Sequence, residues 1–332
     1  MKINFEHRMS AHCENGVISN LLRFYGIDLS EPMIFGMGSG IYFSYLPFYK
    51  LNGLPVTSFR PWPGLIFKRI SKALDIEMHI RRYRDPEKAM RELDMNLEKG
   101  IPTGMVVGVF HLSYFPAPYR FHFNAHNIVA FGKENGEYQI SDPVMESVEQ
   151  LSAFDLKRVR YAEGVAKPRG KMYYIKSIPK KIDIESAIRK GLKRTVLEMI
   201  KLPGPIIGVT GMKYLGSRIR KWPAKLGERK AGQYLGQIVR MQEEIGTGGA
   251  GFRFLFAAFL QEASEKLGIS ALNDLSGEMT QVGDQWREFA VKAGRIYKGR
   301  QSSETYDDLA NHLISIAENE KKVYQGIDKV IN

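Results

Sequence analysis

Cysteine is almost absent from this chain, because Cys13 is the one thiol among 332 residues. A single thiol excludes an internal disulfide and a zinc site built from thiolates, and it is typical of a reducing compartment. Long apolar runs are also missing, since the least polar stretch, residues 202–212, is too short and too rich in glycine and proline to span a bilayer. The first 16 residues contain no apolar segment of the signal-peptide type. We therefore expect a cytoplasmic protein without a transmembrane segment.

Acidic residues are scarce over one long segment. From Lys157 to Lys230 there are 21 Lys and Arg against 5 Asp and Glu, a net charge of +16, whereas the whole chain carries +12 and the remainder about −4. Such a segment attracts nucleic acid, an acidic carrier protein or an anionic membrane face, or it is a solvated surface without a partner. No RNA-reading motif and no repeated alternation of basic and aromatic residues accompanies it, so we expect no nucleic acid.

What is present is a change of pattern along the chain. Residues 14–25 and 86–100 have apolar side chains at helical spacing. Between residues 101 and 177 the apolar runs are short, β-branched and aromatic, and Gly, Asn and Pro separate them. These runs predict an antiparallel sheet, with a hairpin turn at 133–137.

After residue 180 the pattern becomes helical nearly to the last residue. The clearest predicted helices cover residues 184–200, 229–245, 250–267 and 279–297, and one more starts near Ser303. The length suits two domains of ordinary size. We therefore predict an α+β domain over residues 1–180 and an all-α helical domain over residues 181–332.

Cys13 stands directly before the predicted helix 14–25. At a helix N-terminus the unpaired backbone N–H groups and the helix dipole favour a thiolate, which lowers the pKa of the thiol. The thiolate is an effective nucleophile when an imidazole can accept its proton. The other interpretation is a small buried residue without chemistry, because free cysteine is among the most buried residue types.

A histidine and an aspartate of the predicted sheet are candidates to act with Cys13. His126 lies within one strand and Asp142 at the end of the next, and a carboxylate can fix the tautomer of an imidazole and stabilise the imidazolium. A hairpin with a two- or four-residue turn places Asp142 opposite Val129 and faces it away from His126. An odd-length loop or a bulge places it opposite Ile128, on the face of His126. The triad hypothesis therefore requires one of these two features.

The sequence around these three residues resembles a known family. An early cysteine before a helix, a distant histidine and a short hairpin to Asp142 resemble the papain-like fold of the C39 cysteine peptidases that process bacteriocins. The stretch HCENGVISNLLRFYGIDLSEPMIFGMGSGIYFSY and the later HNIVAFG…ISDP resemble more closely the N-terminal domain of the butirosin biosynthesis protein H family. IGTGGAGFRFLFAAFLQEA resembles the domain that usually follows it. The resemblance covers nearly the whole chain and implies a papain-like (C39-like) domain followed by a helical domain.

The resemblance implies acyl transfer in specialised metabolism. The donor would be the phosphopantetheine thioester of a carrier protein, the acceptor an amine or hydroxyl of a small molecule, and no cofactor would be bound permanently. Cys13 would take the acyl group, His126 would deprotonate Cys13 and later the acceptor, and Asp142 would orient His126. The basic segment would then suit an acidic acyl carrier protein.

The oxyanion donors are the point at which this chain departs from the peptidases. A C39 peptidase typically has a glutamine six residues before its cysteine, and here that position is His7. The departure argues against ordinary peptidase chemistry. The candidates that remain are the backbone N–H of Cys13 and the side chains of His7 and His12.

Two other patterns have alternative interpretations. Thr247, Gly248 and Gly249 precede a predicted helix, where backbone N–H groups could bind a phosphate or carboxylate of the substrate, or Thr247 could cap that helix without any ligand. His122 and His126 have the spacing of two metal ligands, but no Asp, Glu or third His stands at a matching spacing, so we expect no metal site.

Two further function classes are compatible with the sequence. A papain-like amidase or thioesterase would use the same Cys–His–Asp set with water as the acceptor. In a non-catalytic basic binding module, Cys13 would be structural and the helical domain would hold an acidic partner.

Overall fold

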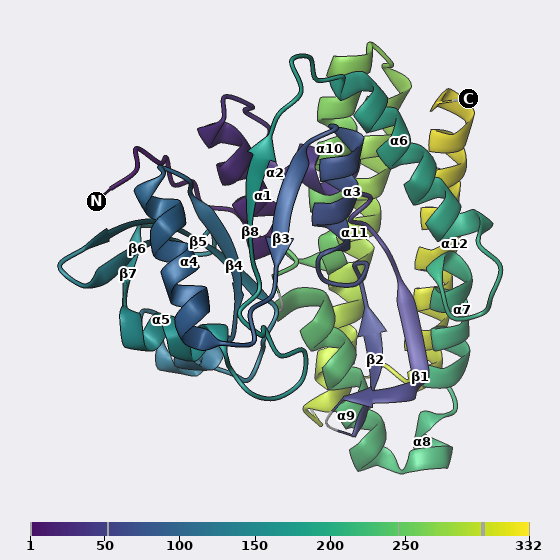
Figure 1. Ribbon diagram of the computed structural model, residues 1–332. Helices are drawn as coiled ribbons and strands as arrows, with labels where there is room; N and C mark the ends of the chain where they lie inside the picture. The colour runs from purple at the N-terminus through teal and green to yellow at the C-terminus, as the bar shows by residue number, and fades with distance from the viewer. Residues whose placement is uncertain (1, 52, 245, 300–302, 332) are drawn as a thin grey trace. The chain divides into compact units, whose positions relative to one another are not determined.

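The computed structural model describes residues 2–51, 53–244, 246–299 and 303–331 (Figure 1). The chain divides into two compact units, the first from Met1–Ile34 and Ile70–Ile182, the second from Phe35–Arg69 and Asp183–Asn332. An antiparallel sheet, a helix that begins at the cysteine and a helical C-terminal half together confirm the predicted α+β fold class.

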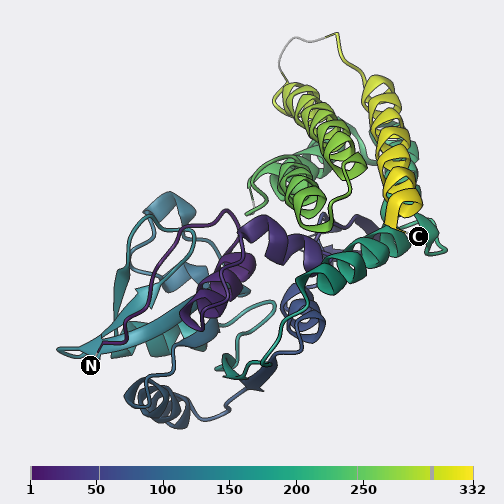
Figure 2. The same cartoon turned by 90° about the horizontal axis from the view of Figure 1, so that it is seen from above.

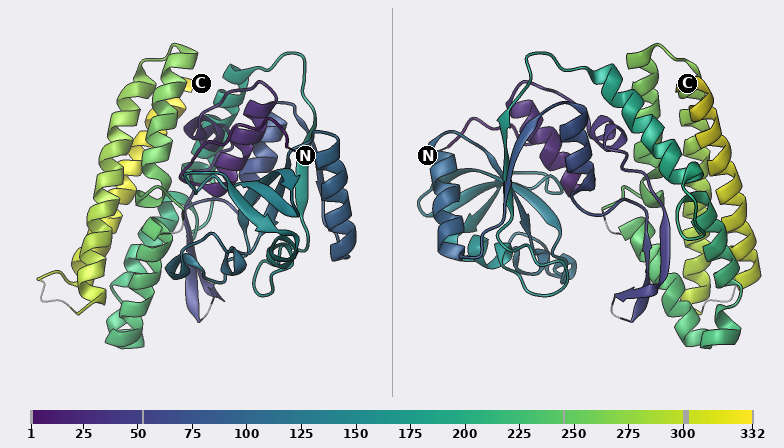
Figure 3. Two further views of the ribbon diagram at one scale, coloured as in Figure 1. Left: turned by 90° about the vertical axis from the view of Figure 1, so that its left-hand side faces the viewer. Right: turned by 45° about the vertical axis from the view of Figure 1, so that its right-hand side comes forward.

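The first unit is built on a six-stranded antiparallel sheet in the order β3-β8-β4-β5-β6-β7. The strands are β3 (Glu77–Arg81), β4 (Thr103–Val107), β5 (His126–Glu134), β6 (Glu137–Ser141), β7 (Glu149–Ser152) and β8 (Met172–Ser177). Helix α1 (Cys13–Phe24) covers one face of β5, and α4 (Pro86–Glu98) covers the other (Figure 3). Because both faces are covered, β5 is buried from its first residue to Gly132.

Helix α4 shows how the local sequence sets the ends of these helices. The carboxylate of Asp85 accepts the backbone N–H of Glu87 at 2.9 Å, and Pro86 occupies the first turn, where its missing N–H has no cost. Gly100, with a φ of 72°, follows the last turn. Helix α5 (Ala153–Arg160) begins in the same way, with the Ser152 hydroxyl accepting an N–H of the first turn.

The second unit consists of one hairpin and a set of helices, of which α10, α11 and α12 lie side by side (Figure 2). The hairpin is β1 (Ser44–Leu51) and β2 (Leu54–Ser58). The α-helices that lie wholly in this unit are α6 (Ile184–Val196), α7 (Gly208–Ile219), α8 (Trp222–Leu226), α9 (Glu228–Val239), α10 (Arg253–Leu267), α11 (Ala271–Tyr297) and α12 (Tyr306–Ile331). Two more helices, α2 (Glu31–Met37) and α3 (Leu65–Ala73), belong partly to each unit. Within the described ranges, no helix is both long and apolar enough to cross a membrane.

A buried polar cluster joins the three long helices of the second unit. The carboxylate of Glu320 on α12 accepts hydrogen bonds from Arg253 on α10 at 2.9 and 3.1 Å and from the indole N–H of Trp286 on α11 at 2.6 Å. The Tyr324 hydroxyl donates to the same carboxylate at 3.1 Å. Because the charges are paired and hydrogen-bonded, they can remain in a core without water.

Most of the predicted helices of the second half are found with shifted ends. The helix predicted from residue 229 is α9 with one wider turn after it, and residue 245 lies outside the described residues. The helix predicted over 279–297 starts earlier, at Ala271. Helix α7 has no counterpart among the clearest predicted helices, because two prolines and three glycines dilute the pattern over residues 202–212. Both prolines precede Gly208, the first residue of the helix.

Candidate active site

Cys13 is the first residue of α1 and is buried. Glu31 fixes the chain just before it, since its carboxylate accepts the backbone N–H groups of Ala11 and His12, each at 2.8 Å. His12 is the N-cap residue of the helix and is buried as well. The thiol therefore lies at a helix N-terminus, in the position that the sequence predicts.

The hairpin between β5 and β6 has a tight turn. Glu134 pairs with Glu137, so the turn contains only Asn135 and Gly136, with φ values of 52° and 84°. Two central residues with positive φ are typical of a type I′ turn, whose twist matches that of the strands. A turn of this length, followed by regular pairing, would face Asp142 away from His126.

A β-bulge in β5 changes that register. Gly132 pairs with Gln139, but the next pair is Ala130 with Ile140, so Phe131 is an extra residue in its strand. The N-terminal segment supports the bulge. The backbone N–H of Ile3 donates to the Phe131 carbonyl at 3.0 Å. The Phe5 ring stacks on the Phe131 ring, with 5.2 Å between the ring centroids. The bulge is one of the two features that the triad hypothesis requires.

Beyond the bulge, Val129 pairs with Ser141, and the next position along the hairpin sets Asp142 opposite Ile128. Asp142 then lies on the face of His126, and its Oδ2 is 2.7 Å from Nε2 of the imidazole. The carboxylate is fully buried, and the His126 side chain is 6% exposed.

Two further donors hold the Asp142 carboxylate. The Tyr114 hydroxyl donates to Oδ2 at 2.8 Å, and the backbone N–H of Val144 donates to Oδ1 at 3.2 Å. The pKa of Tyr114 is well above its usual value, mainly because the side chain is buried and secondly because the charge of Asp142 is near. This hydroxyl therefore keeps its proton and acts as a donor. No sequence pattern points to Tyr114, because it stands in an aromatic segment without periodic spacing.

The imidazole of His126 lies between the carboxylate and the thiol. Burial alone would lower the pKa of His126. The charges of Asp142 and the Cys13 thiolate, with the hydrogen bonds to both, together outweigh burial and raise this pKa to about 10. Since Nε2 faces Asp142, Nδ1 is left to face Cys13. The arrangement favours an imidazolium beside a thiolate, which is the reactive form of a Cys–His pair.

His7 is placed differently from the expected oxyanion donor. Its Nε2 is 3.1 Å from the Met145 carbonyl and must donate to it, and its Nδ1 is 2.8 Å from the Ser141 hydroxyl oxygen. With both nitrogens engaged, the ring fixes the segment after β6 and has no N–H left for an oxyanion. His12 and the backbone N–H of Cys13 remain the predicted candidates.

Thr247, Gly248 and Gly249 belong to the second unit, whereas Cys13 belongs to the first. The Thr247 hydroxyl donates to the Gln242 carbonyl at 2.6 Å and accepts the N–H of Gly249 at 3.0 Å. These bonds close the loop on itself. Thr247 is also not the cap of α10, whose N-cap residue is Phe252, so the capping expectation is wrong in detail. A role of these residues in substrate binding stays a prediction.

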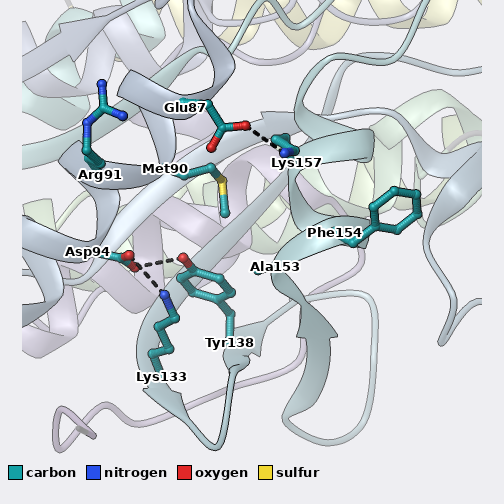
Figure 4. Close-up of a pocket in the computed structure, with 9 residues that line it drawn as sticks. All are labelled: Glu87, Met90, Arg91, Asp94, Lys133, Tyr138, Ala153, Phe154 and Lys157. Carbon is teal, nitrogen blue, oxygen red and sulfur yellow. Dashed lines mark hydrogen bonds and ion pairs between the residues drawn. The ribbon is translucent and has the colours of Figure 1, made fainter.

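A separate polar pocket of about 350 Å³ lies between α4, α5 and the β5–β6 hairpin (Figure 4). Four of the five charged side chains that line it are paired: Lys157 with Glu87 at 2.7 Å, and Lys133 with Asp94 at 2.9 Å. Asp94 also accepts from the Tyr138 hydroxyl at 2.7 Å. We assign this pocket no part in the chemistry of Cys13. In the part of the chain that the structure describes, no three His, Cys, Asp or Glu side chains are grouped to hold a metal ion.

Family models match both halves of the chain. The model described as "Butirosin biosynthesis protein H, N-terminal" matches residues 12–143, and the one described as "Domain of unknown function (DUF4872)" matches residues 154–327. The chain belongs to the butirosin biosynthesis protein H-like family. This family match, with the cysteine, histidine and aspartate described above, suits a cysteine-dependent enzyme.

Two further comparisons carry no part of this family assignment. A solved structure from Bacillus anthracis, described as a C39-like peptidase, is similar to 54% of this chain over 100% of its own length, with 13% identity and a TM-score of 0.37. The comparison with curated proteins finds no match for this butirosin biosynthesis protein H-like chain.

Proposed function

We propose that this protein is a cysteine-dependent acyltransferase that moves an acyl or aminoacyl group from a carrier-protein thioester to an amine or hydroxyl of a small molecule. The observation that supports this most is the bulge-aligned pair of His126 and Asp142, 2.7 Å apart, beside a thiol at the start of α1. The match to the butirosin biosynthesis protein H model supports acyl transfer as the reaction class.

In the first step the Cys13 thiolate attacks the thioester carbonyl and forms a tetrahedral intermediate. The C–S bond to phosphopantetheine then breaks, and the departing thiolate takes the proton of the His126 imidazolium. One thioester replaces another, so no oxidant or reductant is needed. Asp142 keeps the imidazole oriented and supports its positive charge.

In the second step the acceptor attacks the acyl-enzyme. His126, now neutral, accepts the proton of the amine or hydroxyl, the C–S bond to Cys13 breaks, and the thiolate–imidazolium pair is restored. A hydrolase would follow the same path with water as the acceptor, so the acceptor alone separates the two reactions.

The donor that we propose is carried by an acidic protein, for which the second unit has a suitable surface. Lys221, Lys225, Arg229 and Lys230 are all exposed on α8, on α9 and beside them, and we call this set the α8–α9 basic surface. Complementary charge of this kind speeds encounter and orients a partner.

The direct test is intact-mass analysis after incubation with an acyl thioester of N-acetylcysteamine or of a carrier protein. We expect one acyl adduct on the wild-type protein and none on Cys13→Ala, because Cys13 is the only thiol. Adding a primary amine should release the adduct as an amide faster than water releases the free acid. Release as free acid alone would favour the hydrolase, and an adduct that persists in Cys13→Ala would contradict the proposal.

A further inference from the structure

Asn127 presents a buried amide N–H to the Cys13 thiol. The proposed roles of His126 and Asp142 give this amide no function. Its Nδ2 is 3.9 Å from the Cys13 Sγ and 3.2 Å from the Ala125 carbonyl, and the side chain is buried. The carbonyl can only accept, so the nitrogen end of the amide is the end near Cys13. The same nitrogen carries a second hydrogen, which is available in the direction of the sulfur.

Tyr173 fixes the opposite end of this amide. Its hydroxyl donates to Oδ1 of Asn127 at 2.8 Å. Burial, followed by the charges of Glu14 and Cys13, raises the pKa of Tyr173 well above its usual value, so the hydroxyl keeps its proton. Two independent contacts therefore hold the amide in one orientation.

A glycine in the sheet, Gly104, leaves space for the contact between Tyr173 and Asn127. Tyr173 is on β8 and Asn127 on β5, and β4 lies between these strands. Gly104 of β4 pairs with Tyr173, and a Cβ at Gly104 would lie 2.3 Å from the tyrosine ring. The absence of a side chain at Gly104 thus lets the ring cross β4 and reach Asn127.

We infer that the Asn127 amide donates a hydrogen bond to the oxyanion that forms on the carbon bonded to Cys13, and that Tyr173 and Gly104 position it. The inference rests on the proposed function, since an oxyanion forms only when Cys13 attacks a carbonyl. A donor next to the sulfur is within reach of an oxygen one carbon away from that sulfur. It also supplies the side-chain donor that His7, bound to Ser141 and Met145, cannot supply.

The test compares two reactions of the same thiol. Acylation by an N-acetylcysteamine thioester passes through an oxyanion, whereas alkylation by chloroacetamide does not. For Asn127→Ala we expect the acylation rate to fall about 100- to 1,000-fold, the usual effect of losing one oxyanion donor. Alkylation should fall severalfold at most, and this reaction also shows that the site is folded.

Tyr173→Phe removes one hydroxyl, and we expect a fall in acylation of about tenfold because Asn127 loses its fixed orientation. Gly104→Ala should lower acylation in the same direction by displacing the ring. The matched control is Tyr174→Phe, the neighbouring tyrosine of β8, which stacks on His79 and should leave both rates unchanged.

Three outcomes separate the possibilities. Equal falls in acylation and alkylation for Asn127→Ala would overturn the oxyanion role, because the amide would then act on the thiol itself. Unchanged acylation in Asn127→Ala would overturn it as well. A wild-type protein that is alkylated at Cys13 but never acylated would overturn the proposed function and, with it, this inference.

Discussion

Burial and two charged neighbours act in opposite directions on the pKa of His126. Burial alone would keep the imidazole neutral, but Asp142 on one nitrogen and Cys13 on the other side raise its pKa to about 10. The imidazolium is therefore present below about pH 10, and it supports the Cys13 thiolate across the neutral range.

Asp142→Asn removes the charge that contributes most to this raised pKa. We expect burial to dominate in the variant, so that His126 loses its proton at a lower pH and no longer supports the thiolate near neutrality. Chloroacetamide alkylation of Cys13 at about pH 7 should slow by roughly tenfold for each unit by which the pKa of the thiol then rises above 7. The measurement is the pH–rate profile of alkylation by intact mass, and superimposable profiles for wild type and variant would contradict the assigned role of Asp142.

At this scale the sequence indicates the members of the proposed triad more directly than the side chains that contact them. Cys13 precedes a visible helix, and His126 and Asp142 stand on visible strands. Tyr114 comes to Asp142 from a segment without a periodic pattern, and the contact of Tyr173 with Asn127 depends on the order of three strands. Contacts of this kind depend on how distant segments pack, which local patterns do not encode.

Among the elements, β5 decides whether the site forms. The spacing of His126 and Asp142 in the sequence requires one extra residue in the loop or the strand, but it does not indicate where that residue lies. The two-residue turn is readable from Asn135 and Gly136, because both tolerate positive φ. The position of the bulge at Phe131 is not readable, since it depends on contacts with the N-terminal segment.

Phe5→Ala tests the support of the bulge. The Phe5 ring is buried and stacks on Phe131, so we expect a loss of roughly 3 kcal/mol in the free energy of unfolding, the usual cost of removing a buried phenylalanine. Cys13 alkylation near neutral pH should also slow if the bulge loosens and Asp142 moves from His126.

Urea unfolding and the alkylation assay measure these two effects. The control is Phe48→Ala, whose ring is 74% exposed, and which should change the free energy of unfolding by less than about 0.5 kcal/mol. Unchanged stability and reactivity in Phe5→Ala would show that the bulge holds without the N-terminal segment.

For the molecule as a whole, we propose that the acidic carrier protein binds the α8–α9 basic surface. Reversing Lys221, Lys225, Arg229 and Lys230 to glutamate should raise the KM for a carrier-bound thioester by roughly tenfold, through lost charge complementarity. The rate with the N-acetylcysteamine thioester should stay near that of the wild type, because this small donor needs no docking surface.

Lys321→Glu with Lys322→Glu, two exposed lysines of α12, is the matched control. It should leave the KM for both donors unchanged. Added salt should weaken the wild-type preference for the carrier-bound donor, because ions screen exposed charges. A KM change per reversed charge that is as large in this two-lysine variant as in the four-residue variant would show that net charge, and not this surface, attracts the carrier.

The sequence also predicts the start of the helical half well, with α6 beginning at Ile184. It does not indicate that residues 35–69 pack with those helices. That segment is apolar and aromatic like the strands of the first unit, and its partner Trp286 lies more than 200 residues further along the chain.

This interleaving has a consequence for synthesis on the ribosome. The hairpin of the second unit, with Phe43 and Phe59 beside it, leaves the ribosome early. Both rings pack against Trp286, which is translated only after the whole first unit. Until α11 has been translated, these rings cannot be buried against Trp286, and they remain exposed to binding by chaperones or by other nascent chains. A chain truncated after Ile182 would thus contain the whole first unit together with a hairpin that lacks its core.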